Sequence, residues 1–263
     1  MTLLYRKPDE FLLFREKVKS IFINNNLRKL AVQNALKDYK SVLKEKNEQL
    51  WELHQKLEII RLEEEENYQS YDYGSGYYYQ SFKPLHISGY RNTEQRIQQL
   101  ELASRTKGKS VLDIGANAGF VLLSIAESIS TGTGIEFNPY LVKTARLAKE
   151  YLEIDNTSFI ASSFENYSNS HQNFDIVLSL ANHSTYDGNT KHSLHEYFKK
   201  VSELLNSNGQ LIFESHPPQI EPEDKLKQTI ETIEQYFVIE EKPKVRMDGF
   251  LDKDRTYIVA KVK

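Results

Sequence analysis

The stretch VLDIGANAGF, residues 111–120, decides how the chain folds. It opens on an apolar run that contains one acid, Asp113, and two glycines, Gly115 and Gly119, follow. Glycine permits a tight turn and a close approach of a ligand, and a helix that starts near Gly119 would present unpaired N–H groups. The stretch therefore predicts a buried strand, a turn that can hold a nucleotide-like ligand, and a helix.

A second acid stands where such a ligand would need one. The run GTGIEF, residues 132–137, predicts the next strand and contains Glu136. This acid follows the turn by about twenty residues, the spacing at which a carboxylate can bind the two hydroxyls of a ribose. Asp113 argues against a pyrophosphate, because an acid that enters the turn suits a cationic cofactor better. A cofactor with an amino group and a sulfonium meets that requirement.

From Tyr90 onward, short apolar runs alternate with helical segments, a pattern typical of βαβ units and a mainly parallel sheet. Strands are predicted at residues 110–114, 132–137, 158–161, 174–180, 209–215, 236–241 and 255–262. Helices are predicted at residues 119–130, 139–151, 191–205 and 222–235. The last two strands have no helix between them, so we expect a doubly wound α/β sheet of seven strands with one of them antiparallel.

Residues 1–66 predict a helical arm. Residues 9–66 contain no glycine or proline, and the asparagines at 24–26 divide the arm into helices at residues 8–22 and 27–66. In the second predicted helix, the a and d positions of a heptad repeat are apolar except for Lys46. These positions are Leu36, Tyr39, Leu43, Lys46, Leu50, Leu53, Leu57 and Ile60. This seam fits either a coiled coil that joins two copies of the chain or an amphipathic helix packed on the chain's own domain.

Residues 67–89 form a tyrosine-rich linker between the arm and the domain that begins at residue 90. Six tyrosines fall between Tyr68 and Tyr79, and the linker has no helical period. It is too apolar for a solvated tether, so we expect it to be core filler between arm and domain or the lid of a site. As a lid, its aromatic faces would attract a sulfonium and help to exclude water.

At these residues the chain resembles the class I S-adenosylmethionine-dependent methyltransferases, whose first motif is an acid with spaced glycines and whose second strand ends in a ribose-binding acid. FDIVLSL, residues 174–180, is similar to the family's fourth-strand motif, and LLNSNGQLIF, residues 204–213, to its turn and fifth strand. The resemblance covers residues 90–263. It implies a Rossmann-like fold, methyltransferase activity and S-adenosylmethionine as the cofactor.

The resemblance also indicates which residues hold the cofactor. They are Asp113, Gly115, Ala116, Asn117, Gly119, Phe120, Glu136, Phe137, Ser163, Phe164, Ser179, Arg91, Thr93 and Tyr79. Asn117 stands where many members have glycine, which asparagine can replace because it tolerates left-handed backbone. Ser163 and Phe164 stand where the family often has an adenine-binding acid. Arg91, with Thr93, can reach the cofactor's carboxylate, and it can equally pair with a neighbouring acid.

Two histidines follow strands at the sheet edge where an acceptor would lie. His183 comes after the fourth strand and His216 after the fifth, and neutral histidine suits proton removal from a hydroxyl near pH 7. Both are candidate general bases, and a structural hydrogen bond is the alternative for each. Neighbouring substrate candidates are Asn182, Tyr186 and Asp187. His183, Asp187 and His216 could instead hold a divalent metal, but no ligand spacing is diagnostic and we predict none.

Several segments resemble those of methyltransferases encoded in bacterial surface-polysaccharide clusters for capsule or O-antigen. These segments are the tyrosine-rich linker, YRNTEQR (90–96), ANHSTYDG (181–188) and ESHPP (214–218). The resemblance implies O-methylation of a sugar, nucleotide sugar or polysaccharide substituent. Two alternatives stay open: an RNA- or tRNA-modifying methyltransferase whose arm binds RNA through Lys37, Lys40, Lys44 and Lys46, and a coiled-coil scaffold with a cofactor-free domain.

The composition fits an ordinary globular protein. The 263 residues include 34 Lys+Arg, 37 Asp+Glu and no cysteine, which leaves a formal charge of −3. We therefore expect a cytoplasmic protein without a membrane span and with little tendency to bind nucleic acid. Expected partners are a small-molecule or glycan acceptor and, through the N-terminal helix, a second copy of the chain.

Overall fold

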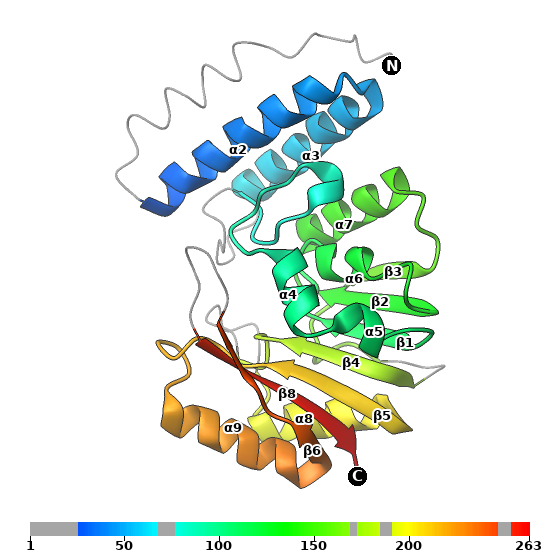
Figure 1. Ribbon diagram of the computed structural model, residues 1–263, viewed down its shortest axis with the longest axis vertical. Helices are drawn as coiled ribbons and strands as arrows, with labels where there is room; N and C mark the ends of the chain where they lie inside the picture. The colour runs from blue at the N-terminus through cyan, green and yellow to red at the C-terminus, as the bar shows by residue number, and fades with distance from the viewer. Residues whose placement is uncertain (1–25, 68–76, 169–172, 185–190, 247–253) are drawn as a thin grey trace.

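A twisted mixed sheet forms the centre of the computed structural model, which describes residues 26–67, 77–168, 173–184, 191–246 and 254–263 (Figure 1). Its strands are β1 (Ser110–Ile114), β2 (Thr131–Glu136), β3 (Thr157–Ala161), β4 (Phe174–Leu180), β5 (Leu205–Glu214), β6 (Phe237–Glu241), β7 (Lys244–Arg246) and β8 (Asp254–Val262). The strand order is β3-β2-β1-β4-β5-β8-β6, and β7 pairs with β8 beside this path.

The sheet confirms the predicted class. β1 to β5 pair in parallel, and β8 runs antiparallel to both β5 and β6. The seven predicted strands are all present, and the three-residue strand β7 is an addition that the sequence pattern did not indicate. Because the carboxyl ends of parallel strands share one edge, the segments after β1, β2, β4 and β5 meet there.

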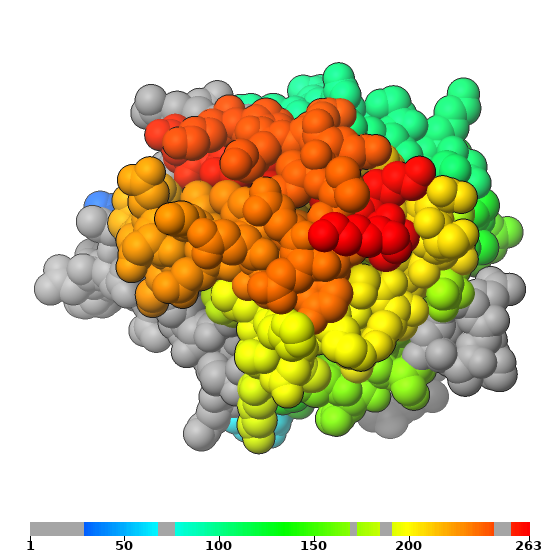
Figure 2. Space-filling model, turned by 90° about the horizontal axis from the view of Figure 1, so that it is seen from below, coloured from blue at the N-terminus to red at the C-terminus, as the bar shows by residue number. Residues whose placement is uncertain are grey.

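Helices cover both faces of the sheet. They are α4 (Thr93–Gln99), α5 (Leu102–Arg105), α6 (Phe120–Ser124), α7 (Pro139–Tyr151), α8 (Leu194–Glu203) and α9 (Glu223–Tyr236). Alternate residues of β1 enter different hydrophobic clusters, Val111 packing with α6 and α7, and Leu112 with α8 and α9. Figure 2 shows α9 and the end of β8 on the outer surface of the second face. The predicted helix 119–130 ends earlier, at Ser124, because the N–H groups of Ile125 and Ala126 bond three residues back instead of four.

The N-terminal arm is a helical hairpin, α2 (Asn26–Glu45) followed by α3 (Glu48–Asn67). The prediction of one helix over residues 27–66 is therefore wrong at its middle. Lys46 has a left-handed φ of 53°, and the side chain of Asn47 accepts a hydrogen bond from Leu50 N at 3.1 Å. A residue in that conformation ends one helix, and an asparagine cap begins the next. The predicted helix at 8–22 lies outside the described residues.

The hairpin packs on the chain's own domain. Leu50, Leu53 and Leu57 of the heptad seam are buried in the same cluster as Phe82 and Phe120. This is the amphipathic arrangement, the second of the two that the seam allows. A coiled coil between copies, and a homodimer through it, stay predictions. None of the described helices is long and apolar enough to cross a bilayer.

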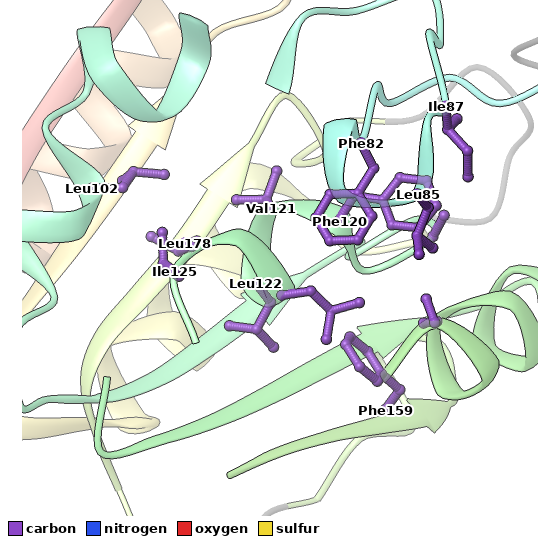
Figure 3. Packing of buried hydrophobic residues seen from close by; sticks show 14 of the residues in the cluster. Phe82, Leu85, Ile87, Leu102, Phe120, Val121, Leu122, Ile125, Phe159 and Leu178 are labelled. Carbon is purple, nitrogen blue, oxygen red and sulfur yellow. The ribbon is translucent and has the colours of Figure 1, made fainter. Parts of the chain in front are cut away.

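The segment 77–91 joins the hairpin to the sheet and includes the short 3-10 helix η1 (Lys83–Leu85). Asn34 Nδ2 donates to Gly89 O at 3.0 Å, and His54 Nε2 lies 2.7 Å from Leu85 O. Phe82 stacks on Phe120 with ring centroids 4.7 Å apart, and Leu85 and Ile87 lie beside them (Figure 3). This part of the linker is core filler, while residues 68–76 lie outside the described residues.

Candidate active site

The glycine turn after β1 has the backbone that its sequence predicts. Gly115, Asn117 and Gly119 have φ values of 65°, 54° and 73°. Asn117 stabilises its own left-handed position, because its side-chain oxygen accepts a hydrogen bond from Ala118 N at 2.8 Å. A Cβ on Gly119 would lie 2.5 Å from Phe159, so a larger residue there would push α6 away from β3. The turn therefore holds the N-terminus of α6 close to the sheet.

Gln80 supports this turn from the linker. Its side-chain oxygen accepts a hydrogen bond from Phe120 N at 3.1 Å, which caps one of the unpaired N–H groups of α6. Gln80 is buried, and it is 40 residues from Phe120 in sequence. Sequence analysis missed Gln80, because no local spacing connects a linker residue to a helix start at that distance.

Glu136 lies beside the turn, where its spacing placed it. Its Oε2 accepts a hydrogen bond from Asn117 N at 2.9 Å, and its Oε1 accepts one from Asn138 N at 2.9 Å. The carboxylate thus spans from the glycine turn to the start of α7. The neighbouring Phe137 is 45% exposed, an unusual position for a large apolar ring. Glu136 and Phe137 thus place a half-buried carboxylate beside an exposed aromatic ring at the end of β2, and we refer to this pair as the half-open Glu136 edge.

Asp113 occupies a different environment under the same turn. It is buried on β1 between β2 and β4. Burial raises the pKa of Asp113 to about 7, with Arg96 opposing the shift and Glu136 adding to it. At neutral pH the side chain is close to its midpoint, so a nearby cation would draw it to the ionised form.

Ser163 and Phe164 follow β3, the strand beside β2. Ser163 Oγ accepts a hydrogen bond from Asn166 N at 3.2 Å. The ring of Phe164 packs on Tyr197, with centroids 4.9 Å apart, and lies under the ammonium of Lys200 at 4.9 Å. Both residues are half-buried at the edge that carries Glu136. Their predicted contact with the adenine stays a prediction.

Ser179 and Asn182 brace the turn from β4. Ser179 Oγ is buried and bonds to Asn182 Oδ1 and to the Tyr197 hydroxyl, each at 2.9 Å. Asn182 in turn donates to the carbonyl of Ile114, and a Cβ on Gly115 would lie 3.0 Å from its amide nitrogen. This arrangement makes Ser179 a support for Asn182. Direct contact of Ser179 with a cofactor stays a prediction.

Three other residues predicted to hold the cofactor have buried side chains, and their contact with the cofactor stays a prediction. The Phe120 ring is fully buried between linker and sheet, so only its main chain can face the turn. Ala116 is buried and donates its N–H to Ile135 O at 2.9 Å. Thr93 is buried at the first turn of α4, where its N–H donates to Ser81 Oγ at 2.9 Å.

The two candidate bases lie together. The rings of His183 and His216 have centroids 4.8 Å apart, and both meet Glu221. His183 Nε2 is 3.0 Å from Glu221 Oε1, and His216 N donates to Glu221 Oε2 at 2.8 Å. Thr229 Oγ1 also donates to Glu221 Oε1, at 2.6 Å. No local pattern indicates Glu221, which lies 38 residues from His183.

The charges in this group follow from its hydrogen bonds. Burial opposes ionisation of Glu221, but bonds from His183, Thr229 and the His216 backbone hold the pKa of Glu221 at about 2. Nε2 of His183 is therefore the donor, and in the neutral imidazole Nδ1 is then the acceptor nitrogen. Nδ1 is buried and has no hydrogen-bond partner among the described residues. Burial, with the charge of His183 next, lowers the pKa of His216 to about 4.

Arg91 pairs with an acid, one of the two roles that the sequence left open. It contacts Glu214, the last residue of β5, and its Nη1 donates to the Tyr79 hydroxyl at 3.3 Å. Arg96 and Arg255 reach the same carboxylate, at 2.7 Å and 3.7 Å. Burial opposes ionisation of Glu214, yet the three arginines hold its pKa at about 2. Contact of Arg91 or Tyr79 with the cofactor stays a prediction.

The remaining candidates cannot be placed. Tyr186 and Asp187 lie outside the described residues. Within the part of the chain that the structure describes, no group of three or more His, Asp or Glu side chains is arranged to hold a metal ion.

Comparison with known proteins identifies the domain. A family model described as a methyltransferase domain matches residues 105–257, more than half of the chain. The chain belongs to this family. The match confirms the predicted methyltransferase and, with it, S-adenosylmethionine as the cofactor of this methyltransferase domain. The glycine turn, the half-open Glu136 edge and the acid beneath them fit a cationic nucleoside cofactor.

Solved structures share the fold of this methyltransferase domain. The N-methyltransferase NodS from Bradyrhizobium japonicum WM9, in complex with S-adenosylhomocysteine, is 17% identical with a TM-score of 0.52, over 64% of this chain and 86% of NodS. A SAM-dependent methyltransferase from Aquifex aeolicus is 13% identical with a TM-score of 0.51, over 66% of this chain and 91% of its own.

A third similar structure is a putative S-adenosylmethionine-dependent methyltransferase from Listeria monocytogenes. It is 15% identical with a TM-score of 0.53, and the match covers 65% of this chain and 100% of the Listeria chain. No curated protein matches the chain. At such identities the likeness shows the fold alone, so the acceptor has to be inferred from the residues of the site.

Proposed function

We propose that this methyltransferase modifies an oxygen of a sugar, nucleotide sugar or polysaccharide substituent in bacterial surface-glycan biosynthesis. The observation that carries oxygen as the acceptor atom is the His183–Glu221 pair. Among the described residues Nδ1 of His183 has no hydrogen-bond partner, and His183 directly follows Asn182, which bonds to the Ile114 carbonyl at the start of the glycine turn. The glycan class rests on the resemblance of the linker and of residues 90–96, 181–188 and 214–218 to enzymes of surface-polysaccharide clusters.

The cofactor site is assigned to residues around the turn. Glu136 would accept hydrogen bonds from the ribose hydroxyls, Asp113 would favour the positive charge, and Gly115 would allow close approach. When bound, S-adenosylmethionine supplies the methyl group: the acceptor oxygen forms the new O–CH3 bond as the S–CH3 bond breaks, its electron pair stays on sulfur, and S-adenosylhomocysteine is released.

His183 takes the proton of the acceptor hydroxyl at Nδ1. Glu221 holds the ring by Nε2 and stabilises the imidazolium that forms, since a carboxylate at 3.0 Å favours the protonated ring. His216 is a poor base, because its low pKa disfavours protonation. The His183 side chain is 1% exposed, so the acceptor oxygen must displace the groups that shield Nδ1 from solvent.

A screen of acceptors tests the reaction. The enzyme is incubated with S-adenosylmethionine and, separately, with free sugars, sugar phosphates, nucleotide sugars, capsular polysaccharide or tRNA. Release of S-adenosylhomocysteine is measured by mass spectrometry, and the methylated atom is located by NMR. We expect a methyl ether on a sugar derivative. Transfer to tRNA alone, or to nitrogen, would contradict the proposal.

Variants then test the base. We expect His183→Ala to lower kcat by about 10²-fold or more while cofactor affinity stays within about twofold. Glu221→Gln keeps the shape of its side chain, and we expect it to lower kcat, because the carboxylate that stabilises the imidazolium is lost. His195→Ala is the matched control, since this histidine is exposed on α8 and bonds to Tyr236. Equal kcat in all three variants would exclude His183 as the base.

A further inference from the structure

Three arginines surround one carboxylate at the carboxyl end of β5. Arg91, Arg96 and Arg255 are 3%, 3% and 5% exposed, and Glu214 is fully buried. Three positive charges and one negative charge leave a surplus of two. Among the described residues Asp113 also interacts with the cluster, through the charge of Arg96, and it is only partly ionised near neutral pH. A buried surplus of charge is costly unless another group neutralises it.

Arg255 is the least satisfied of the three. Among the described residues its guanidinium donates one hydrogen bond, from Nη1 to Ser215 O at 2.9 Å, while its Nε lies 3.7 Å from Glu214 Oε1. A guanidinium has five N–H donors, so most of those of Arg255 are available to a ligand. Burial and the charges of Arg91 and Arg96 lower the pKa of Arg255 despite Glu214, so an added anion would relieve this repulsion.

The positive charges of the three arginines also act on the phenol of Tyr79. Burial alone would raise the pKa of Tyr79, but Arg91, Arg96 and Arg255 lower it. The cluster thus favours a negative charge at a second point, independent of Glu214.

The cluster adjoins the proposed base. Glu214 is two residues before His216, and Arg255 bonds to the carbonyl of Ser215 between them. The cofactor turn follows β1, whereas Glu214 ends β5 and Arg255 lies on β8, two and three strands farther along the sheet. At about 4.8 Å between strands, Glu214 and Arg255 are roughly 10–14 Å from the β1 position, whereas Arg96 is close enough to Asp113 of β1 to act on its charge. The location of Glu214 and Arg255 is on the acceptor side of the site.

We propose that Arg91, Arg96 and Arg255 bind an oxyanion, a carboxylate or phosphate, carried by the acceptor. Guanidinium groups bind these oxyanions through paired N–H donors, and a buried cluster holds them in a fixed orientation. The acceptor is then an acidic sugar or a phosphorylated sugar, anchored next to His183. This inference rests on the proposed function, since it assigns the substrate class of the same site.

Inorganic phosphate is the probe, used with S-adenosylhomocysteine bound. Calorimetric titration with phosphate, at an ionic strength held constant with NaCl, is done on the full-length enzyme after S-adenosylhomocysteine has been added to saturation. We expect saturable phosphate binding that Arg255→Gln weakens about tenfold or more. Arg105→Gln is the matched control, because this arginine pairs with Glu241 on the exposed surface, and we expect it to bind phosphate as the wild type does.

The outcomes separate the two proposals. Failure of S-adenosylhomocysteine to bind would count against the cofactor site and the proposed function. Normal S-adenosylhomocysteine binding without phosphate binding, or with equal binding in Arg255→Gln, would overturn the oxyanion site. Phosphate binding that S-adenosylhomocysteine abolishes would assign the arginines to the cofactor's carboxylate and also overturn it. Should Arg255→Gln fail to fold, Arg255→Lys keeps the charge, and we expect severalfold weaker phosphate binding from the loss of paired donors.

Discussion

Asp113 and Glu136 are acids on adjacent strands whose environments give them different roles. Glu136 is half-buried and accepts two backbone hydrogen bonds, whereas Asp113 is buried on β1 beneath the turn. Burial therefore raises the pKa of Asp113 to about 7, so its side chain stays protonated at pH values where most carboxyl groups are ionised. The charge under the cofactor turn depends on pH near neutrality.

Cofactor affinity should follow that charge. Asp113 is neutral below about pH 7 and ionised above it, and the ionised form attracts a sulfonium. We expect S-adenosylmethionine to bind more tightly as the pH rises from 6 to 8, by at most about tenfold per pH unit. Calorimetry at several pH values measures this slope. Asp113→Asn should flatten the slope, and an unchanged slope in that variant would assign the titration to another group.

Residue positions were predictable where local spacing defines them. Gly115, Gly119 and Glu136 follow from one strand-turn-helix pattern and the strand after it. Glu221 and Gln80 were not predictable, because each reaches its partner across 38 or 40 residues of chain. Such contacts depend on how loops close over the sheet edge, which periodicity does not encode.

For the arm, too, some features could be predicted from the sequence and others could not. Its helical character and its buried seam follow from the lack of glycine and the heptad spacing. The hairpin does not, because one residue in left-handed conformation, Lys46, reverses the chain. Lys46, the polar residue in the heptad seam, was the sequence feature that indicated the helix end, and Asn47 beside it caps α3. A polar residue at a seam position followed by a capping residue thus indicates a helix end.

Asp38 of α2 fastens the linker that carries Gln80. It is buried and accepts hydrogen bonds from Ser88 N at 2.7 Å, Ser88 Oγ at 2.5 Å and the Tyr77 hydroxyl. We expect Asp38→Ala to lower the free energy of unfolding by about 2–3 kcal/mol, since three half-buried donors lose their acceptor. Chemical denaturation measures the loss. Lys37→Ala, on the exposed side of α2, is the control, and an equal effect of both variants would contradict this role.

The whole molecule has a continuous core from the arm to the sheet. Trp51 and Leu57 of α3 belong to the cluster that contains Phe120 of α6 and Phe159 of β3. The described part of the arm therefore packs on the domain, and α3 contacts α7, where Lys143 Nζ lies 3.3 Å from Glu63. The domain boundary near residue 66 stays a prediction.

A single unfolding transition is the consequence. Trp51 is the only tryptophan, so its fluorescence reports the arm while far-UV circular dichroism reports helices and sheet together. We expect both signals to change at the same urea concentration in the wild type and in Leu57→Ala, which should lose about 2–5 kcal/mol. Ile59→Ala, at an exposed position, should lose about 0.5 kcal/mol or less. Separate transitions would show an arm that unfolds on its own.

Calorimetric titration with S-adenosylmethionine is the most direct test of the central claim, that the turn after β1 and the acid at the end of β2 form the cofactor site. We expect one molecule to bind per chain and Glu136→Ala to weaken binding about tenfold or more, because two hydrogen bonds from the ribose are lost. Glu127→Ala, an exposed position after α6, should bind as the wild type does. No binding at millimolar cofactor, or equal affinity in Glu136→Ala, would contradict the account.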